Sequence, residues 1–332
     1  MNTPTTGRVL VTTHPFGEID RDPIDLLENA GIPYTLNPYH RRLREEELAQ
    51  MIAPYEALIA GTEPITESVL IKAENLRLIA RVGIGLDSVA LAAARKRGIA
   101  VTYTPSGPSP AVAELTVAQM LALLRRTMTA DREIRDGVWR RRIGRRLAYM
   151  TVGIIGVGRI GRLVIGHLKG WSPRILANDL RRDLEFSRLS GCIWTDADTI
   201  YRDADIISLH VPLTPRTRGM VGERELAMMK PDAILINTAR GELIDEPALV
   251  AALGRRPLFS AALDVFAEEP YKGELVGLDN CLLTAHMGSA TRDCRLQMEL
   301  EAAQEVVRHF KGEPFATPVP DDEYASQSED AD

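Results

Sequence analysis

Residues 151–161 have the sequence Thr-Val-Gly-Ile-Ile-Gly-Val-Gly-Arg-Ile-Gly, and this stretch decides the fold. The apolar run 152–155 predicts a buried strand, and the apolar spacing over 162–168 predicts a helix. Between them lie three glycines, Gly156, Gly158 and Gly161. The first permits a tight turn, the second lets the backbone approach a pyrophosphate, and the third lets the helix pack closely on the strand. The backbone N–H groups of Arg159 and Ile160, at the start of the helix, would then face the phosphates of a dinucleotide.

A second marker of the same site is Asp179, which lies 18 residues after Gly161 at the end of the predicted strand 175–178. A carboxylate there can accept hydrogen bonds from both ribose hydroxyls of NAD, and it would repel the 2'-phosphate of NADP. Arg181 and Arg182 follow closely and weaken that preference, because arginine commonly binds phosphate. The cofactor is therefore predicted to be NAD, with NADP as the less favoured alternative.

The rest of the chain alternates strand-like and helix-like segments. Short apolar runs occur at residues 8–12, 58–60 and 76–80, and again at 151–155, 174–178, 206–210, 233–237 and 260–263. Strands separated by helix-length segments predict an α/β fold with parallel, doubly wound sheets covered on both faces. One helix is expected over residues 108–137, and a last helix over 293–310 that returns to the first sheet.

These segments predict two Rossmann-like domains, and a length of 332 residues agrees with two domains rather than one. The substrate-binding (catalytic) domain is expected to be discontinuous, formed by residues 1–105 and 288–316, and the NAD-binding domain by residues 106–287. Residues 317–332 carry six acids and no Lys or Arg, so this acidic tail is expected to be disordered or only lightly pinned.

Composition argues against several classes of protein. The net charge is -6, and without the acidic tail the chain is close to neutral, which is unlike a nucleic-acid-binding protein. The basic segment 140–146 is expected to be solvated or to contact another subunit. No long apolar stretch and no apolar leader are found, so a cytoplasmic protein without a membrane partner is expected. No metal site is expected, since the three cysteines are widely separated at Cys192, Cys281 and Cys294.

Three further segments carry polar residues at the ends of predicted strands. They are Asn-Thr-Ala-Arg-Gly at 237–241, Asp-Val-Phe-Ala-Glu-Glu-Pro at 264–270 and Thr-Ala-His-Met-Gly at 284–288. With Val-Gly-Ile-Gly at 82–85, the glycine-rich turn at 156–161 and His-Val-Pro-Leu at 210–213, they resemble the D-isomer-specific 2-hydroxyacid dehydrogenase family. The resemblance covers the chain up to about residue 316.

The resemblance implies a catalytic set of Arg240, Glu269 and His286. Arg240 matches the arginine that holds the substrate carboxylate and polarises the keto oxygen, a role that suits a guanidinium group. His286 matches the general acid/base and Glu269 its partner, because a carboxylate beside an imidazole fixes its tautomer and favours the protonated ring that reduction requires. The implied reaction interconverts a 2-keto acid and a D-2-hydroxy acid, with the hydride supplied by the cofactor.

The resemblance also implies a substrate and cofactor site in the cleft between the two domains. Val82 and Gly83 match a loop whose backbone N–H groups bind the substrate carboxylate, and Arg81 is a candidate phosphate contact. Asp264 matches the residue that contacts the nicotinamide carboxamide. Further cofactor contacts are expected from His210, Val211, Pro212, Thr217, Thr238, Ala239 and Gly288.

The substrate stays open among several acids. Arg81 and its loop favour 3-phosphoglycerate, but Gly61 stands where phosphoglycerate dehydrogenases often carry an arginine, and a regulatory extension after residue 332 is not expected. Glyoxylate, hydroxypyruvate, a phosphonate or a sugar acid are alternatives. The C-terminal binding protein corepressors have the same fold and catalytic residues, so an NAD-responsive binding protein is a further alternative. The resemblance also implies a homodimer through the cofactor domains, with the helix 108–137 and the arm around Trp139 in the interface.

Overall fold

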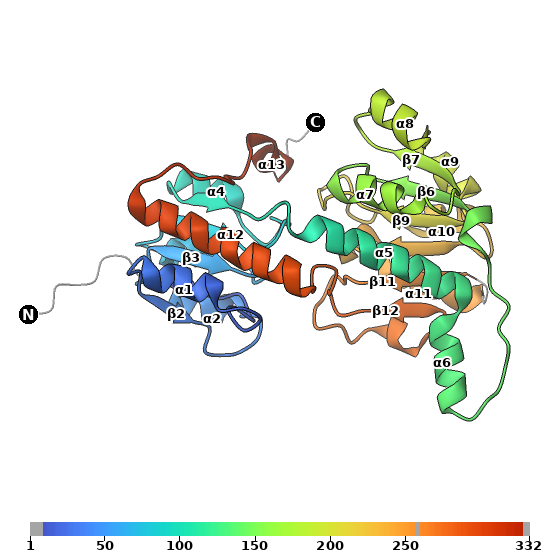
Figure 1. Ribbon diagram of the computed structural model, residues 1–332, viewed down its shortest axis with the longest axis horizontal. Coiled ribbons are helices and arrows are strands. Elements are labelled where there is room, and N and C mark those ends of the chain that lie inside the picture. The colour runs from blue at the N-terminus through green and yellow to red at the C-terminus, as the bar shows by residue number, and fades with distance from the viewer. Residues whose placement is uncertain (1–8, 257–258, 328–332) are drawn as a thin grey trace, which may run out of the picture. The chain divides into compact units, whose positions relative to one another are not determined.

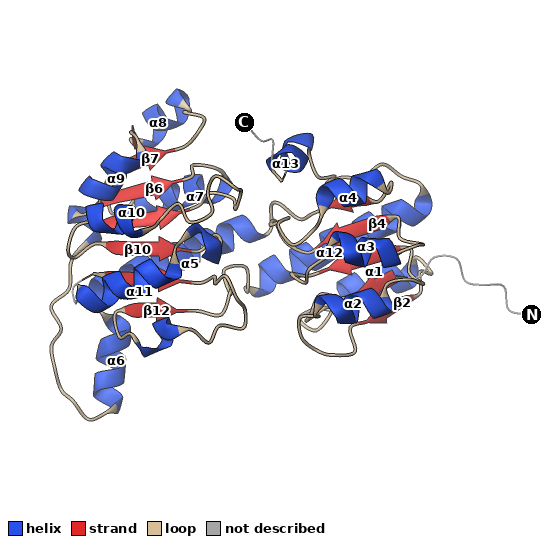
Figure 2. Ribbon diagram, turned by 180° about the vertical axis from the view of Figure 1, so that it is seen from behind, coloured by secondary structure: helices blue, strands red, loops and turns tan. Residues whose placement is uncertain are grey.

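The computed structural model describes residues 9–256 and 259–327, and it divides into two compact units (Figure 1). Unit 1 is formed by Met1–Pro108 and Ala290–Asp332, and unit 2 by Ser109–Ser289. Each unit contains one parallel β-sheet with helices packed over its strands, as Figure 2 shows by colour. The predicted α/β class with two Rossmann-like parallel sheets is confirmed.

Unit 1 is built around a five-stranded sheet in the order β2-β1-β3-β4-β5. Its strands are β1 (Val9–Val11), β2 (Tyr34–Leu36), β3 (Ala57–Ala60), β4 (Leu78–Arg81) and β5 (Ala100–Thr102). Its helices are α1 (Asp22–Asn29), α2 (Glu45–Met51), α3 (Glu67–Lys72), α4 (Leu91–Lys96), α12 (Arg292–Lys311) and α13 (Asp321–Ser326). Strands β1, β3 and β4 are buried along their whole length, as parallel strands covered on both faces should be. The strand order reverses between β1 and β3, and ligands of such open sheets bind at the carboxyl ends beside this reversal.

Unit 2 is built around a seven-stranded sheet in the order β12-β11-β10-β9-β6-β7-β8. Its strands are β6 (Thr151–Ile155), β7 (Arg174–Asn178), β8 (Ile193–Trp194), β9 (Ile206–Leu209), β10 (Ile234–Asn237), β11 (Ser260–Leu263) and β12 (Cys281–Leu283). Its helices are α5 (Pro108–Arg125), α6 (Thr127–Arg135), α7 (Arg159–Leu168), α8 (Leu184–Ser190), α9 (Ala197–Asp203), α10 (Glu223–Met228) and α11 (Glu246–Arg255), with short 3-10 turns at Leu147–Tyr149, Gly241–Leu243 and Glu274–Gly277. The order reverses between β6 and β9, so the glycine-rich turn after β6 lies where this fold binds nucleotides.

The single helix predicted over residues 108–137 is wrong, because the chain forms α5 and α6 with a break at Arg126. Arg126 has the left-handed φ of 52°, and Figure 1 shows α6 leaving α5 at a steep angle. The carbonyl of Leu124 accepts a hydrogen bond from the N–H of Arg145 at 2.9 Å, so the returning arm closes the end of α5. Helix α5 buries Met120 and Leu124, whereas α6 buries none of its residues.

Residues 317–327 of the acidic tail make defined contacts with unit 1. The N–H of Tyr103 donates to the carbonyl of Thr317 at 3.2 Å, and the N–H of Val319 donates to the carbonyl of Val101 at 3.0 Å. Val319 is buried in the core of unit 1. Backbone pairing beside β5 and one buried valine therefore hold this part of the tail in place. Residues 328–332 of the predicted tail lie outside the described residues.

The basic segment 140–146 is partly neutralised by acids of unit 2. Arg145 pairs with Asp232 at 3.0 Å, and the Nε of Arg142 donates to Glu133 at 3.0 Å. Within the described ranges, no helix has the length and apolar character that crossing a bilayer requires. The same ranges contain no group of three or more His, Cys, Asp or Glu side chains that could hold a metal ion.

Candidate active site

The glycine-rich turn after β6 has the shape that a pyrophosphate needs. Gly156 has a φ of +95°, and a Cβ atom at this position would lie 2.5 Å from the carbonyl of His210. A Cβ atom on Gly161 would lie 2.1 Å from the carbonyl oxygen of Gly156, whereas a Cβ atom on Gly158 would meet nothing within 4 Å. Helix α7 begins at Arg159 and has no side-chain cap. The first N–H groups of α7 therefore have no side-chain cap, and the space beside Gly158 is open, which together fit the phosphates of a dinucleotide.

Asp179, directly after β7, is held beside this turn by two backbone groups. One carboxylate oxygen accepts a hydrogen bond from the N–H of Val157 at 2.7 Å, and the other accepts one from the N–H of Arg181 at 3.0 Å. Each oxygen of a carboxylate can accept a second hydrogen bond, so the group retains acceptors for two ribose hydroxyls. The position of Asp179 and its remaining acceptor sites fit NAD.

His210 follows β9 and lies against the same turn. Its Nε2 is 2.9 Å from the hydroxyl oxygen of Ser208, and its buried Nδ1 has no hydrogen-bond partner in the described residues. Burial lowers the pKa of His210 to about 4, so the ring is neutral near pH 7. In the loop that follows, the hydroxyl of Thr217 donates to the carbonyl of Pro212 at 2.7 Å, which fixes residues 211–217 beside β9.

Asn237, the last residue of β10, shapes the segment that carries Arg240. Its side-chain amide donates to the carbonyl of Arg240 at 2.8 Å, and its side-chain oxygen accepts from the N–H of Ala239 at 3.0 Å. Thr238 lies beside it and makes a hydroxyl contact of 3.0 Å with Thr116 on α5. Asn237 is fully buried, and sequence reasoning did not include it in the site although it stood in the quoted motif. The sequence feature that could have identified Asn237 as a site residue is its position at the end of a strand, three residues before Arg240.

His286 and Glu269 form the pair that the sequence predicted as acid/base and partner. The Nδ1 of His286 lies 2.9 Å from Oε2 and 3.1 Å from Oε1 of Glu269. Glu269 also accepts a hydrogen bond from the N–H of Phe266 at 3.1 Å, so the carboxylate is fixed from two sides. Because Nδ1 faces the carboxylate, Nε2 is the ring nitrogen left for another molecule.

Asp264, after β11, holds the loop in which His286 stands. One of its oxygens accepts from the hydroxyl of Thr284 at 2.6 Å and from the N–H of Met287 at 2.9 Å, and the other accepts from the N–H of Gly288 at 2.8 Å. The N–H of His286 donates to the carbonyl of Asp264 at 2.7 Å. Sequence reasoning predicted a nicotinamide contact for Asp264 and missed this network, which gives His286 its left-handed φ of 48°.

The loop of unit 1 that was predicted to bind substrate is held by contacts within that unit. The N–H of Val82 donates to the carbonyl of Ala60 at 2.8 Å, and the N–H of Gly83 donates to the hydroxyl of Thr104 at 2.7 Å. Both groups have partners inside unit 1, and these contacts fix the backbone of the loop that was predicted to bind the substrate carboxylate. Arg81 is buried, and its guanidinium donates to the carbonyl of Val82 beneath Gly83. Gly83 has a φ of +139°, and a Cβ atom there would collide with Arg81.

Comparison with known proteins agrees with this site. Residues 117–288 match the description "D-isomer specific 2-hydroxyacid dehydrogenase, NAD binding domain". The chain is 39% identical to a glyoxylate reductase of Thermococcus litoralis over 80% of this chain and 84% of that protein. It is 37% identical to a D-3-phosphoglycerate dehydrogenase of Methanocaldococcus jannaschii over 92% of this chain, which spans only 58% of that protein. A solved structure of a Thermus thermophilus protein superposes with a TM-score of 0.84 at 34% identity, covering 94% of this chain and 100% of that chain.

These matches confirm the predicted family, its NAD cofactor and its oxidoreductase chemistry. The chain belongs to the D-isomer specific 2-hydroxyacid dehydrogenases, NAD-binding enzymes that act on a CH–OH group.

Proposed function

We propose that this enzyme interconverts a 2-keto acid and a D-2-hydroxy acid, with His286, Glu269 and Arg240 as its catalytic residues. The observation that carries the proposal is the contact of 2.9 Å between His286 and Glu269, in the same unit as an open glycine-rich turn. NAD, when bound, supplies or accepts the hydride at C2 of the substrate. The residues of the chain handle the proton and the carboxylate.

His286 moves the proton through Nε2. In reduction, Nε2–H gives its proton to the oxygen of the C2 carbonyl, and in oxidation Nε2 takes the proton of the hydroxyl group. Glu269 keeps the proton on Nδ1 in both directions, because its carboxylate faces that nitrogen at 2.9 Å. The positive charge that forms on the ring during oxidation therefore forms next to a negative charge.

Arg240 binds the substrate carboxylate through its guanidinium group, which suits two parallel hydrogen bonds. Its Nη1 donates to the carbonyl of Ala239 at 2.6 Å, which limits the directions available to the side chain. In unit 1, the substrate site is lined by Arg81, Val82 and Gly83. The buried guanidinium group of Arg81 donates to the carbonyl of Val82 and so holds this loop in place.

The NAD contacts follow from the turn geometry. The pyrophosphate is held by Gly156, Gly158, Arg159, Ile160 and Gly161. The adenosine ribose is held by Asp179, whose carboxylate disfavours NADP. The remaining contacts are assigned to His210, Val211, Pro212, Thr217, Thr238, Ala239, Asp264 and Gly288.

The test follows NADH absorbance with the purified protein and a set of keto acids: glyoxylate, hydroxypyruvate, 3-phosphohydroxypyruvate, 2-ketogluconate and phosphonopyruvate, each repeated with NADPH. Reduction of at least one acid to its D-2-hydroxy product supports the proposal. The His286→Ala variant should lose roughly 10²–10⁴-fold in turnover and keep NADH binding. Full activity in that variant, or no reduction of any acid by a protein that binds NADH, would reject it.

We further propose a homodimer formed through unit 2. Helix α6 buries none of its residues, and the arm after it exposes large apolar side chains. The exposed fractions are 81% for Trp139, 91% for Ile143 and 74% for Tyr149. Apolar side chains gathered on one segment are typical of a protein interface. Sedimentation of the protein and of a Trp139→Ser variant tests this, and a monomer at micromolar concentration would contradict it.

A further inference from the structure

The acidic tail is attached to a loop that the proposed mechanism uses. This loop, residues 82–90, joins β4 to α4 and contains the proposed substrate contacts Val82 and Gly83; we call it the substrate loop. The described part of the tail, residues 317–327, has no part in the proposed mechanism. Two connections run from this part of the tail to the substrate loop, one through β5 and one through the side chain of Gln327.

The first connection passes through the end of β5. The carbonyl of Thr317 accepts a hydrogen bond from the N–H of Tyr103 at 3.2 Å. The next residue, Thr104, is buried and makes two hydrogen bonds with Gly83. Its hydroxyl accepts from the N–H of Gly83 at 2.7 Å, and its own N–H donates to the carbonyl of Gly83 at 3.1 Å. The tail therefore pairs with the residue next to the one that fixes the start of the substrate loop.

The second connection is direct and uses the side-chain amide of Gln327. Its Nε2 donates to the carbonyl of Leu86, in the middle of the substrate loop, at 2.8 Å. Its Oε1 accepts from the N–H of Leu91, the first residue of α4, at 3.3 Å. One exposed side chain thus fixes the substrate loop at its middle and at its far end. Both partners are backbone groups, so a substitution of Gln327 tests the contact without changing the sequence of the loop.

Helix α13 brings Gln327 to this position, and Figure 2 shows α13 beside α4. Tyr324 on α13 packs against the core of unit 1, and the guanidinium group of Arg95 on α4 lies 3.5 Å from the centroid of its ring. Arg95 also pairs with Asp321 at 2.5 Å, but the two side chains are 52% and 93% exposed, so this ion pair is weak. Because α13 lies on the surface, loss of the Gln327 contact would free the substrate loop without opening the core of unit 1.

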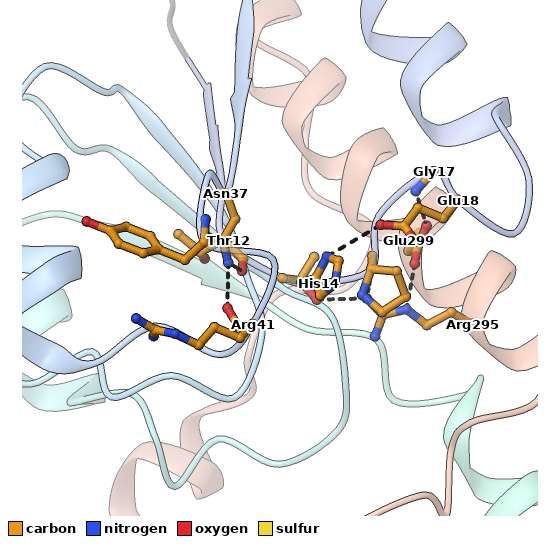
Figure 3. A network of polar contacts seen from close by, with 11 residues as sticks. Thr12, His14, Gly17, Glu18, Asn37, Arg41, Arg295 and Glu299 are labelled. Carbon is orange, nitrogen blue, oxygen red and sulfur yellow. Dashed lines mark hydrogen bonds and ion pairs between the residues drawn. The ribbon is translucent and has the colours of Figure 1, made fainter.

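The segment after β1, residues 12–18, lies at the same edge of the sheet but is held by α12. Arg295 on α12 pairs with Glu299 at 2.5 Å and donates to the hydroxyl of Thr13 at 2.9 Å. Glu299 is 2% exposed and accepts a hydrogen bond from the N–H of Gly17 at 2.8 Å, as Figure 3 shows. These contacts do not involve the tail, so this segment is an internal reference for motion of the substrate loop.

We propose that Gln327 is a positioning residue for substrate binding: its hydrogen bond to the carbonyl of Leu86 keeps the substrate loop in the position that binds the keto acid. The inference rests on the proposed function, which assigns Val82 and Gly83 of that loop to the substrate site. Without the bond, the loop occupies this position for a smaller fraction of the time, and the apparent affinity for the acid falls by that fraction. One hydrogen bond of ordinary strength corresponds to a factor of about three to ten.

The experiment measures kcat and KM of the full-length enzyme for glyoxylate and hydroxypyruvate with saturating NADH. In Gln327→Ala the KM for the keto acid should rise about threefold to tenfold, while kcat and the NADH dissociation constant change less than about twofold. Gln327→Glu keeps an oxygen for the N–H of Leu91 but loses the donor to Leu86, so its KM should rise at least as much. The matched control is Gln50→Ala, at an exposed glutamine on α2 of the same unit, which should change none of these values.

Hydrogen exchange gives a readout that does not depend on activity. In Gln327→Ala the backbone amides of residues 84–90 should exchange faster than in the unmodified enzyme, whereas those of residues 12–18 should keep their rates. Equal exchange in residues 84–90, an unchanged KM in either Gln327 variant, or an equal rise of KM in Gln50→Ala overturns the role of Gln327 and leaves the dehydrogenase assignment standing. Failure of the unmodified enzyme to reduce any of the keto acids overturns the proposed function and this inference with it.

Discussion

The Glu269→Gln substitution isolates the charge of the catalytic pair. The glutamine side chain has nearly the same shape and can still accept a hydrogen bond from Nδ1–H of His286 through its oxygen. It can also still accept the hydrogen bond that the N–H of Phe266 donates to Glu269 at 3.1 Å. The ring therefore keeps its tautomer and position, and only the negative charge beside it is lost.

The size of the effect follows from the contact of 2.9 Å and from the exposure of the pair. Two unit charges about 4 Å apart interact by about 4 kcal/mol at an effective dielectric constant of about 20. The side chains of His286 and Glu269 are 37% and 22% exposed, so solvent screening reduces this to about 1.5–2 kcal/mol. In oxidation the ring gains its charge in the transition state, and such a loss lowers kcat/KM by roughly 10- to 30-fold.

The assay measures NADH formation from NAD and the D-2-hydroxy acid of the best keto acid in the set. Glu268→Gln is the matched control, because Glu268 is the adjacent acid, is exposed and forms no ion pair within the described residues. NADH binding should be unchanged in both variants. A loss below about twofold in Glu269→Gln, or an equal loss in Glu268→Gln, would refute the charge argument.

Three further substitutions test the surrounding residues. Asp179→Ala should reduce the preference for NADH over NADPH, measured as a ratio of kcat/KM, and an unchanged ratio would remove Asp179 as the ribose ligand. Asp264→Asn should lower the free energy of unfolding by about 2–3 kcal/mol in urea, because the carboxylate accepts three hydrogen bonds, and an unchanged transition would contradict the network. Burial lowers the pKa of His210 from 6.5 to about 4 in the folded protein. The neutral buried ring therefore stabilises the fold fully above about pH 6.5, and this stabilisation is lost as the pH falls toward about 4, because the unfolded chain binds the proton first. Between about pH 7 and about pH 5, the free energy of unfolding of the unmodified enzyme should fall by up to about 2 kcal/mol more than that of the His210→Gln variant. Equal falls in the two proteins, measured by urea unfolding at each pH, would contradict this.

The sequence predicts most of the cofactor site because that site is formed by residues that lie close together along the chain. A strand, three glycines and a helix within residues 151–168 are enough to define the turn, and Asp179 follows at a fixed distance along the chain. The His286–Glu269 contact could be expected from the family resemblance but not from spacing, since the two residues stand in different loops 17 positions apart. Their contact requires the network of Asp264, which no local pattern indicates.

Other features could not be predicted because they depend on contacts between distant residues. Nothing at Arg126 signals a helix break, since the segment contains neither glycine nor proline and the break is closed by Arg145. The N–H of Gly83 is taken by a hydroxyl 21 residues later, so its availability cannot be read from the loop itself. A glutamate in a loop, such as Glu63, is normally expected in solvent, and only the fold shows that it is buried.

The two sheets follow one geometric rule and carry different polar groups at the place where it applies. In unit 2 the strand order reverses between β6 and β9, and the ends of these strands offer backbone N–H groups of α7 beside Gly158. Such a surface attracts an anion, and the dinucleotide carries one. In unit 1 the order reverses between β1 and β3, and the corresponding ends offer the carboxylate of Glu63. The same strand arrangement therefore places different polar groups at the two reversals, and the difference lies in the residues that follow each strand.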